Sequence, residues 1–168
     1  MKAAITTRLA VLDDADAIRR IYNHEVETST VTFDLVPRSL ADQRRWLTER
    51  SGAHAVLVAE AGDAERTIVG FASLSPWRDR PAYRTSVEDS VYVRSDHRGE
   101  GVGLVLLTAL LRVAAEHGFH TVFGRIVGGH AASIALHEAC GFRTVGVEKE
   151  VGRKFGRWLD VVVMQRML

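Results

Sequence analysis

The stretch Asp96-His97-Arg98-Gly99-Glu100-Gly101-Val102-Gly103 decides the fold, because it joins a β-branched run to an apolar segment with helical spacing. Its glycines stand at alternate positions, where they let the backbone turn sharply and come close to a ligand. Amide N–H groups at the start of a helix attract an anion, and the helix dipole strengthens that attraction. The stretch therefore predicts a phosphate-binding turn between a strand and a helix, with a glycine-rich turn that binds nothing as the plainer alternative.

Two common nucleotide-binding motifs do not fit this turn. A nucleoside-triphosphate loop needs Gly-Lys followed by Ser or Thr, whereas Leu104 and Val105 follow Gly103. A dinucleotide fingerprint needs another glycine three positions after Gly101, where Leu104 stands. The sequence therefore indicates a phosphate ligand of another kind.

The segments on both sides of the turn predict a mixed α and β domain. Runs rich in β-branched residues predict strands over residues 4–9, 54–60, 67–75, 86–94, 121–127, 143–151 and 157–166. Apolar spacing, capping residues and closing glycines predict a helix capped by Asp13 or Asp14, and further helices over 39–50, 101–118 and 131–139. We expect turns at Gly62-Asp63 and at 152–156, and a loop from Thr28 to Pro37. This order predicts antiparallel hairpins at both ends of the sheet.

Length and composition favour one compact domain over residues 1–168. Apolar residues make up 46% and charged residues 26%, close to globular averages. The net charge of +1 provides no long-range attraction for nucleic acid. The chain has no apolar run of membrane-spanning length, and Met1 to Val11 lacks the apolar core of a signal peptide. We therefore expect a cytoplasmic protein without a nucleic-acid or membrane partner.

Disulfide and metal chemistry are not expected. Cys140 is the single cysteine, which excludes an internal disulfide, and its apolar helix favours a buried thiol. His117 and His120 are spaced like a ligand pair, but Gly118 stands between them and no second cluster accompanies them. The prediction is that the protein holds no metal.

The pattern Arg98-x-x-Gly101-x-Gly103, preceded by Val91-Tyr92-Val93, resembles the acyl-CoA loop of the GCN5-related N-acetyltransferase (GNAT) superfamily. The later segment His130 to Phe142 is similar to a second motif of that superfamily. The likeness extends over nearly the whole chain to the phosphinothricin and methionine sulfoximine/methionine sulfone N-acetyltransferases, most specifically at Val151 to Asp160.

The resemblance implies an α+β GNAT fold, with a mixed, mostly antiparallel central sheet flanked by helices. It also implies acetyl-CoA as cosubstrate, no metal, a homodimer, and an amino-acid-like acceptor such as phosphinothricin, methionine sulfoximine or methionine sulfone. The residues expected to hold coenzyme A are Val91, Tyr92, Val93, Arg98, Gly99, Glu100, Gly101, Val102, Gly103, His130 and Ser133.

Acetyl transfer needs a neutral amine, stabilisation of an oxyanion, and a proton for the departing thiolate. Strand alternation puts Glu88, Ser90 and Tyr92 on one face, and Val87, Asp89, Val91 and Val93 on the other, apolar face. Glu88 can therefore face a cleft and act as general base through water, or else be a solvated strand carboxylate. The resemblance implies a break in strand pairing here, which lets the Val93 N–H receive the oxyanion.

Ser133 and His137 stand four residues apart, on one helix face. The resemblance implies that Ser133 contacts coenzyme A and that His137 protonates the thiolate, where many superfamily members have tyrosine. The alternative is a helix histidine bonded to its neighbours. His130 stands where the superfamily commonly has asparagine, so its bond to pantetheine or its cap on the helix is expected to be only partial.

The acceptor site is expected in the polar, aromatic stretch before the 86–94 strand. Guanidinium groups match carboxylate and phosphinate oxygens, which makes Arg78 and Arg80 candidate anchors. Phe33, Trp77 and Tyr83 are candidate apolar walls, and the resemblance adds Tyr92 beside Tyr83. Each of these aromatic residues could instead be ordinary loop surface or core.

Two other functions stay open. One is a GNAT acetyltransferase that acts on another amine, such as a polyamine or a protein N-terminus. Polyamines would favour an acidic pocket, whereas Arg78 and Arg80 favour an anionic acceptor. The other is an acyl-CoA sensor without catalysis, against which Glu88 and His137 together argue.

Overall fold

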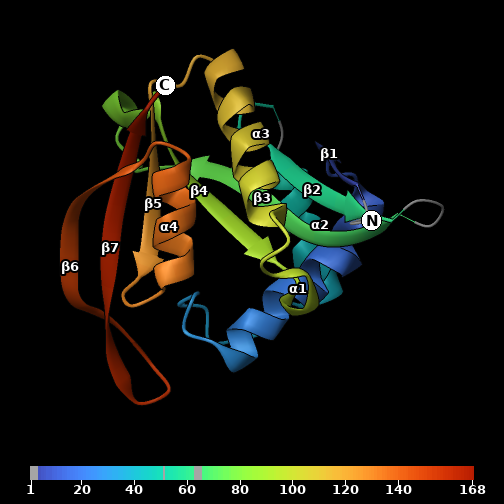
Figure 1. Ribbon diagram of the computed structural model, residues 1–168, viewed down its shortest axis with the longest axis horizontal. Helices are drawn as coiled ribbons and strands as arrows, with labels where there is room; N and C mark the ends of the chain where they lie inside the picture. The colour runs from blue at the N-terminus through green and yellow to red at the C-terminus, as the bar shows by residue number, and fades with distance from the viewer. Residues whose placement is uncertain (1–3, 51, 63–65) are drawn as a thin grey trace.

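The structure, a computed structural model, describes residues 4–50, 52–62 and 66–168. It contains a seven-stranded sheet in the order β1-β2-β3-β4-β5-β7-β6, with helices on both faces (Figure 1). The strands are β1 (Ile5–Leu9), β2 (Val56–Ala61), β3 (Thr67–Pro76), β4 (Ser86–Val93), β5 (Thr121–Val127), β6 (Arg143–Lys154) and β7 (Arg157–Met167). The helices are α1 (Ala15–Thr28), α2 (Leu40–Glu49), α3 (Val102–Glu116) and α4 (Ala131–Ala139).

The neighbouring strands pair antiparallel except for β4 and β5, which are parallel. The predicted mixed, mostly antiparallel sheet flanked by helices is therefore confirmed. The predicted turn at Gly62-Asp63 lies partly outside the described residues, because Asp63 is not among them.

The first two helices begin by different means. Ser39 caps α2 as predicted, because its Oγ accepts the Asp42 N–H at 3.1 Å. Asp14 stands at the N-cap of α1, but its side chain makes no capping bond, and in this respect the prediction was wrong. The Asp14 carboxylate instead accepts from the Arg8 guanidinium at 2.7 Å and from the Val11 N–H at 2.8 Å.

The C-terminal hairpin is longer than predicted. Strands β6 and β7 continue to Lys154 and Arg157, so the turn consists of Phe155 and Gly156 rather than residues 152–156. The pairing is interrupted between Glu148 and Gly152 by a bulge, an irregularity that strand periodicity does not reveal. Asp160 of β7 holds the bulge by accepting from the Glu150 N–H at 2.8 Å.

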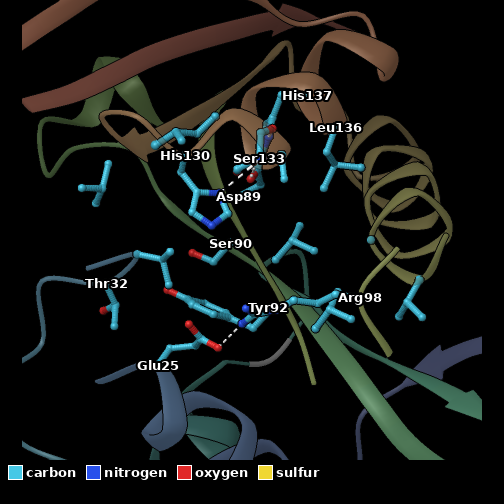
Figure 2. Close-up of a pocket in the computed structure, with 18 of the residues that line it drawn as sticks. Glu25, Thr32, Asp89, Ser90, Tyr92, Arg98, His130, Ser133, Leu136 and His137 are labelled. Atoms are coloured by element: carbon cyan, nitrogen blue, oxygen red, sulfur yellow. Dashed lines mark hydrogen bonds and ion pairs between the residues drawn. The ribbon is translucent and has the colours of Figure 1, made fainter. Parts of the chain in front are cut away.

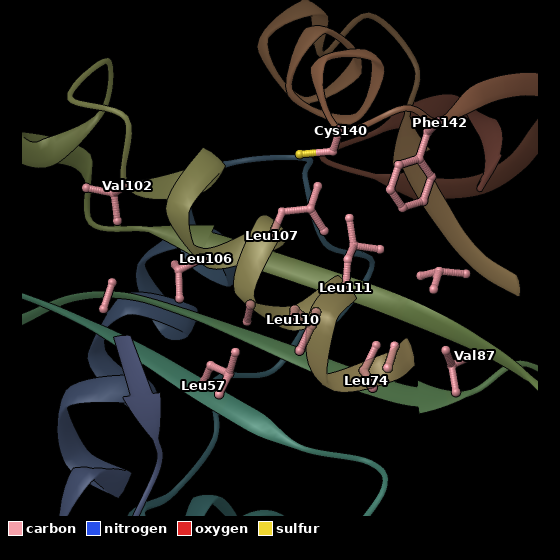
Figure 3. Packing of buried hydrophobic residues seen from close by; sticks show 14 of the residues in the cluster. Leu57, Leu74, Val87, Val102, Leu106, Leu107, Leu110, Leu111, Cys140 and Phe142 are labelled. Atoms are coloured by element: carbon pink, nitrogen blue, oxygen red, sulfur yellow. The ribbon is translucent and has the colours of Figure 1, made fainter. Parts of the chain in front are cut away.

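Two apolar clusters fix the sheet between its helical layers. On one face, α3 packs its leucines against β2, β3 and β4, as Figure 3 shows for Leu106 and Leu110 near Leu57 and Leu74. On the other face, α1 packs against Phe71 and Tyr92. Each fully buried apolar side chain contributes about 1.5–3 kcal/mol, so both layers hold β4 firmly from its two sides. Cys140 is buried in the first cluster, as expected.

Strands β4 and β5 pair only over Ser86 to Glu88, opposite Thr121 to Phe123. Beyond Glu88 the two strands separate, while β4 stays paired with β3 as far as Val93. One edge of β4 is therefore free of strand partners along residues 89–93. This separation is the break in pairing that was expected near the end of β4.

Candidate active site

A cavity of about 510 Å³ lies where β4 and β5 separate. Its walls come from β4, the 97–104 turn, the start of α4, the end of β5 and the loop between α1 and α2 (Figure 2). Residues from five segments that are distant in the sequence thus surround one space. The walls include most of the residues expected to hold coenzyme A, except Glu100.

The glycine turn has the predicted geometry. Gly99 and Gly101 have φ of 77° and 89°, in the left-handed region, and Gly101 is the N-cap of α3. A Cβ at either position would meet no atom within 4 Å. Glycine is therefore required by the left-handed backbone conformation, whereas the surrounding space would admit a larger side chain. Gly103 differs, because a Cβ there would lie 3.1 Å from the Leu136 side chain, which would have to shift by a few tenths of an ångström. The turn therefore presents the amides at the start of α3 to the cavity.

Arg98 has a partner that sequence analysis did not identify. Its guanidinium is ion-paired with Glu25 of α1, whose side chain is buried, and Figure 2 shows the two facing each other across the lower part of the cavity. Glu25 also accepts from the Ser29 Oγ at 2.7 Å. Glu100 is exposed and accepts a hydrogen bond from His97 at 2.8 Å, away from the cavity walls. The turn is thus tied to α1 through Arg98.

The backbone of β4 directs amide groups into the cavity. The Arg94 N–H donates to the Val69 carbonyl at 2.8 Å, on the β3 side. Because N–H groups alternate along a strand, those of Val91 and Val93 point the other way, toward the edge that β5 leaves free. Both residues line the cavity. The Val93 N–H is therefore available to an oxyanion, the role that the resemblance implies for it.

Glu88 is half-buried at the point where β4 and β5 separate, and it lines the cavity. Burial raises the pKa of its carboxyl above the usual range, while the positive charge of Arg125 opposes the rise. Arg125 also lines the cavity and is ion-paired with Glu148 of β6. A carboxyl with a raised pKa is a better proton acceptor near neutral pH than an ordinary glutamate. Sequence analysis did not identify Arg125.

His137 lies buried in the last turn of α4, and its ring is bonded at both nitrogens. Nδ1 lies 2.7 Å from the Ser133 carbonyl and Nε2 lies 3.1 Å from the Asp89 Oδ1. Burial lowers the pKa of His137, but the hydrogen bond and charge of Asp89 more than offset this and raise it overall. Asp89 was predicted only as a member of an apolar strand face. A carboxylate on an apolar strand face indicates a buried ion pair or hydrogen bond, because a buried charge needs a partner.

His130 caps the start of α4, and this cap was expected to be only partial. The His130 Nδ1 accepts the Ser133 N–H at 3.3 Å, a long bond for a helix cap. Ser133 and His130 both line the cavity, next to the Asp89 and His137 pair (Figure 2). The residues proposed to contact coenzyme A on α4 are therefore grouped on its first turn.

The candidate acceptor residues fall into two groups. Phe33 and Tyr92 line the cavity. Trp77, Arg78, Arg80 and Tyr83 do not, and the exposed loop after β3 holds the last three. The Trp77 ring stacks on Phe123 with 4.0 Å between centroids. The structure thus does not bring the two predicted arginines together with Glu88 in this cavity.

The loop between α1 and α2 is fastened over the cavity from two sides. On the α1 side, the Tyr22 hydroxyl bonds Thr32 at 2.9 Å and Asp34 at 2.6 Å. From the C-terminal hairpin, the buried Lys154 Nζ donates to the Thr32 carbonyl at 2.9 Å. Phe33 packs so tightly on Gly152 that a Cβ there would lie 2.4 Å from its ring. The hairpin therefore fixes the position of Phe33.

Comparison with known proteins gives the class to which this fold and cavity belong. Residues 7–163 match the family model described as acetyltransferase (GNAT) domain, and the chain belongs to this family. It is an acetyltransferase with the GNAT fold, as the two motifs predicted.

Three relatives are informative about acceptors. The chain is 42% identical over 166 residues to the L-methionine sulfoximine/L-methionine sulfone acetyltransferase of Pseudomonas aeruginosa, covering 98% of this chain and 94% of that protein. A phosphinothricin acetyltransferase from Sinorhizobium meliloti, solved in complex with AcCoA, is 38% identical with a TM-score of 0.92, covering 100% of this chain and 89% of that one. The structure of a ribosomal-protein-alanine N-acetyltransferase from Brucella melitensis is 40% identical with a TM-score of 0.92, covering 97% and 99%.

Among residues 4–50, 52–62 and 66–168, no group of three or more His, Cys, Asp or Glu side chains is arranged to hold a metal ion. Within the same ranges, no helix has the length and apolarity needed to cross a membrane.

Proposed function

We propose that this protein transfers the acetyl group of acetyl-CoA to the amino group of phosphinothricin, methionine sulfoximine or methionine sulfone. The observation that carries the proposal is the cavity at the separation of β4 and β5. It joins the amides at the start of α3, the free edge of β4 and the carboxyl of Glu88 in one space. The similarity to relatives named for these three acceptors supports the choice of amine.

The residues present fit acetyl-CoA as cosubstrate. The left-handed glycines 99 and 101 leave open space beside the N-terminal amides of α3, which suits a pyrophosphate. The Val91 and Val93 backbone offers a strand edge to the pantetheine amides, and His130 and Ser133 flank it from α4. When bound, acetyl-CoA supplies an activated thioester whose carbonyl oxygen becomes negative during transfer. The Val93 N–H, which points toward the free edge of β4, is the donor proposed to stabilise that charge.

Glu88 takes up the proton that the acceptor ammonium must lose before it can attack. Its raised pKa and its position on the cavity wall fit that role, with water carrying the proton where the carboxyl does not reach. His137 is the candidate acid for the departing thiolate, because it lines the cavity and because burial, which lowers its pKa, is outweighed by the hydrogen bond and charge of Asp89, which favour the protonated imidazole.

The acceptor is proposed to lie between Phe33 and Tyr92, with its anionic group held by guanidinium. Arg78 and Arg80 remain candidates, with Trp77 and Tyr83 beside them, although none of the four lines the cavity of one chain. Arg125 is a third candidate because it lines the cavity together with Glu88. An α-amino acid carries its ammonium and carboxylate close together, so a glutamate and an arginine in one cavity complement both.

A homodimer is part of the proposal. Large apolar side chains are exposed on the C-terminal hairpin, among them Phe155 at 57% and Trp158 at 60%. Exposed apolar groups gathered on one element indicate an interaction surface. Light scattering coupled to size exclusion tests this, with twice the chain mass expected, and with Trp158→Arg expected to favour the monomer. We further propose a cytoplasmic enzyme without nucleic-acid or membrane partners, in line with its net charge of +1.

An acceptor screen tests the proposed function. Acetyl-CoA is supplied with L-methionine sulfone, L-methionine sulfoximine, phosphinothricin, a polyamine or an alanine-terminated peptide, and thiol release is followed. We expect release with the first three. Release only with the peptide would favour the second candidate function, acetylation of a protein N-terminus. The Brucella relative is named for that kind of acceptor, a ribosomal-protein alanine. Binding of acetyl-CoA without thiol release with any amine would favour an acyl-CoA sensor.

A further inference from the structure

Asp89 and His137 form a buried pair on the cavity wall. The Asp89 side chain is 2% exposed and that of His137 is 4% exposed, and Figure 2 shows them meeting beneath the first turn of α4. The pair requires Gly124 on β5, because a Cβ there would lie 2.9 Å from the His137 Nε2 and 3.6 Å from the Asp89 Oδ2. Three elements thus cooperate to admit one carboxylate and one imidazole.

The hydrogen bonds determine how many protons the pair holds. The Ser133 carbonyl can only accept, so the His137 Nδ1 must carry hydrogen. The contact from Nε2 to the Asp89 Oδ1 also needs a proton between the two atoms, whichever of them holds it more tightly. The pair therefore holds two protons and behaves as one acid. The Nδ1 bond of 2.7 Å fixes the ring, whereas the proton in the 3.1 Å contact is held more loosely.

The surroundings leave Asp89 as the charge that governs this imidazole. From α4 the neighbour is the Ser133 carbonyl, from β5 it is Gly124, and the Phe142 ring packs edge-on at 4.9 Å. Glu88 precedes Asp89 but belongs to the opposite strand face, and the nearby thiol is that of Cys140, the residue that follows the last turn of α4. Within the described residues, the second oxygen of Asp89 has no hydrogen-bond partner in the protein. A buried carboxylate oxygen without a partner strengthens the attraction to a protonated imidazole.

We propose that Asp89 is a positioning residue for acetyl transfer, which orients His137 and holds with it the proton that the departing thiolate receives. This inference rests on the proposed function. Glu88 takes the first proton from the acceptor ammonium and passes it to solvent before the attack, and as the C–N bond forms Glu88 removes the second proton from the nitrogen. As the C–S bond breaks, sulfur takes the electron pair and the proton shared between Nε2 and Asp89 moves to sulfur. A proton from solvent then restores the pair, which is favourable because a bare Nε2 lone pair would face a carboxylate.

The first test is independent of catalysis. Imidazole nitrogen NMR of the full chain labelled with ¹⁵N, with His137→Gln to assign the signal, follows the protonation of His137 with pH. We expect both ring nitrogens to remain protonated above pH 6.5, the ordinary midpoint, and Asp89→Asn to lower the midpoint. Titration of wild-type His137 at the ordinary midpoint would overturn the proposal, even if the Asp89 variant failed to fold. The result stands whether or not the acceptor assignment is correct.

The second test uses kinetics and a double-mutant cycle. Asp89→Asn is expected to lower kcat roughly 10- to 100-fold, with the KM for acetyl-CoA nearly unchanged and the alkaline limb of the kcat profile at lower pH. Adding Asp89→Asn to His137→Gln should cause little further loss, because residues that act as a unit are not additive. Full additivity would overturn the shared role.

A matched control separates charge loss from local disturbance. Glu138→Gln removes a carboxylate from the residue after His137, but this side chain is exposed and outside the cavity walls. It should leave both the NMR midpoint and kcat unchanged. If wild type releases no thiol with any amine while the NMR result holds, the proposed function fails and the buried acid remains. If wild type is active and Asp89→Asn keeps its full kcat, the role of Asp89 fails and the proposed function stands.

Discussion

Glu88 is held in surroundings that resist its ionisation, and this suits a base. A carboxyl whose pKa is raised in the folded state stabilises the fold below its unfolded pKa, and that contribution is lost as pH rises through the folded value. Above pH 4.5 the ionised group is therefore a growing burden on stability. Function and stability make opposite demands on this one residue.

Replacement of Glu88 by glutamine should separate these demands. The amide cannot accept the amine proton, so kcat should fall about 100-fold or more, while the Kd for acetyl-CoA stays the same. The melting temperature should rise at pH 7 and change little near pH 4, where the wild-type carboxyl is already protonated. Calorimetry measures the melting temperature and an assay of released thiol measures kcat. The exposed Glu116→Gln serves as control. An unchanged kcat would remove Glu88 from the mechanism.

Arg125 should determine the pH at which kcat/KM falls on the acid side of its pH profile. Its positive charge opposes the burial that raises the pKa of Glu88, so removing it should raise that pKa further. The acid limb of kcat/KM for Arg125→Met should therefore lie at higher pH than in wild type. Rate profiles from pH 4 to 9 measure this. A limb that stays in place would mean that the titrating base is another group.

Among elements, the junction between β4 and α3 was the part most open to sequence analysis. The glycine turn, the two faces of β4 and the α3 layer follow from local periodicity and turn chemistry, and the structure has all three. The Glu25–Arg98 and Asp89–His137 pairs could not be predicted, because their members lie 73 and 48 residues apart. The bulge opposite Asp160 was missed because it interrupts the alternation on which strand prediction depends.

Two glycine substitutions should distinguish backbone conformation from side-chain space. Gly101→Ala forces alanine into a left-handed conformation at about 1–2 kcal/mol, and a chain of this size loses about 2–4 °C of Tm per kcal/mol. The KM for acetyl-CoA should rise as well, because the α3 amides shift. Gly146→Ala in β6 is the control, since its Cβ would meet nothing within 4 Å and its φ is not left-handed. Equal effects of the two changes would contradict this account of the turn.

At the scale of the whole molecule, the C-terminal hairpin completes the proposed acceptor side of the cavity. Its bond from Lys154 to Thr32 joins positions 122 residues apart, and Phe33 rests on Gly152. The residues expected to hold coenzyme A lie instead on β4, on α4 and at the start of α3. We therefore expect the two substrates to be bound by separate parts of one sheet.

Gly152→Ala tests this division. The added methyl would overlap the Phe33 ring, so the α1–α2 loop must move away from the cavity. We expect the KM for the acceptor to rise about tenfold, equivalent to about 1.4 kcal/mol, while the KM for acetyl-CoA changes little. Gly146→Ala on the same strand serves again as control. A rise confined to the KM for acetyl-CoA would contradict the assignment of Phe33 to the acceptor side.

In the function proposed above, an amino-acid amine is acetylated in the cavity between β4 and β5, with Glu88 as base. Mass spectrometry of the product, combined with thiol release from acetyl-CoA and L-methionine sulfone, tests it most directly. We expect wild type to form N-acetyl-L-methionine sulfone in equal amount to free coenzyme A, and Glu88→Gln to form it at a rate lower by about 100-fold. Acetylated product formed equally fast by both proteins, or no acetylated product from a wild type that binds acetyl-CoA, would contradict it.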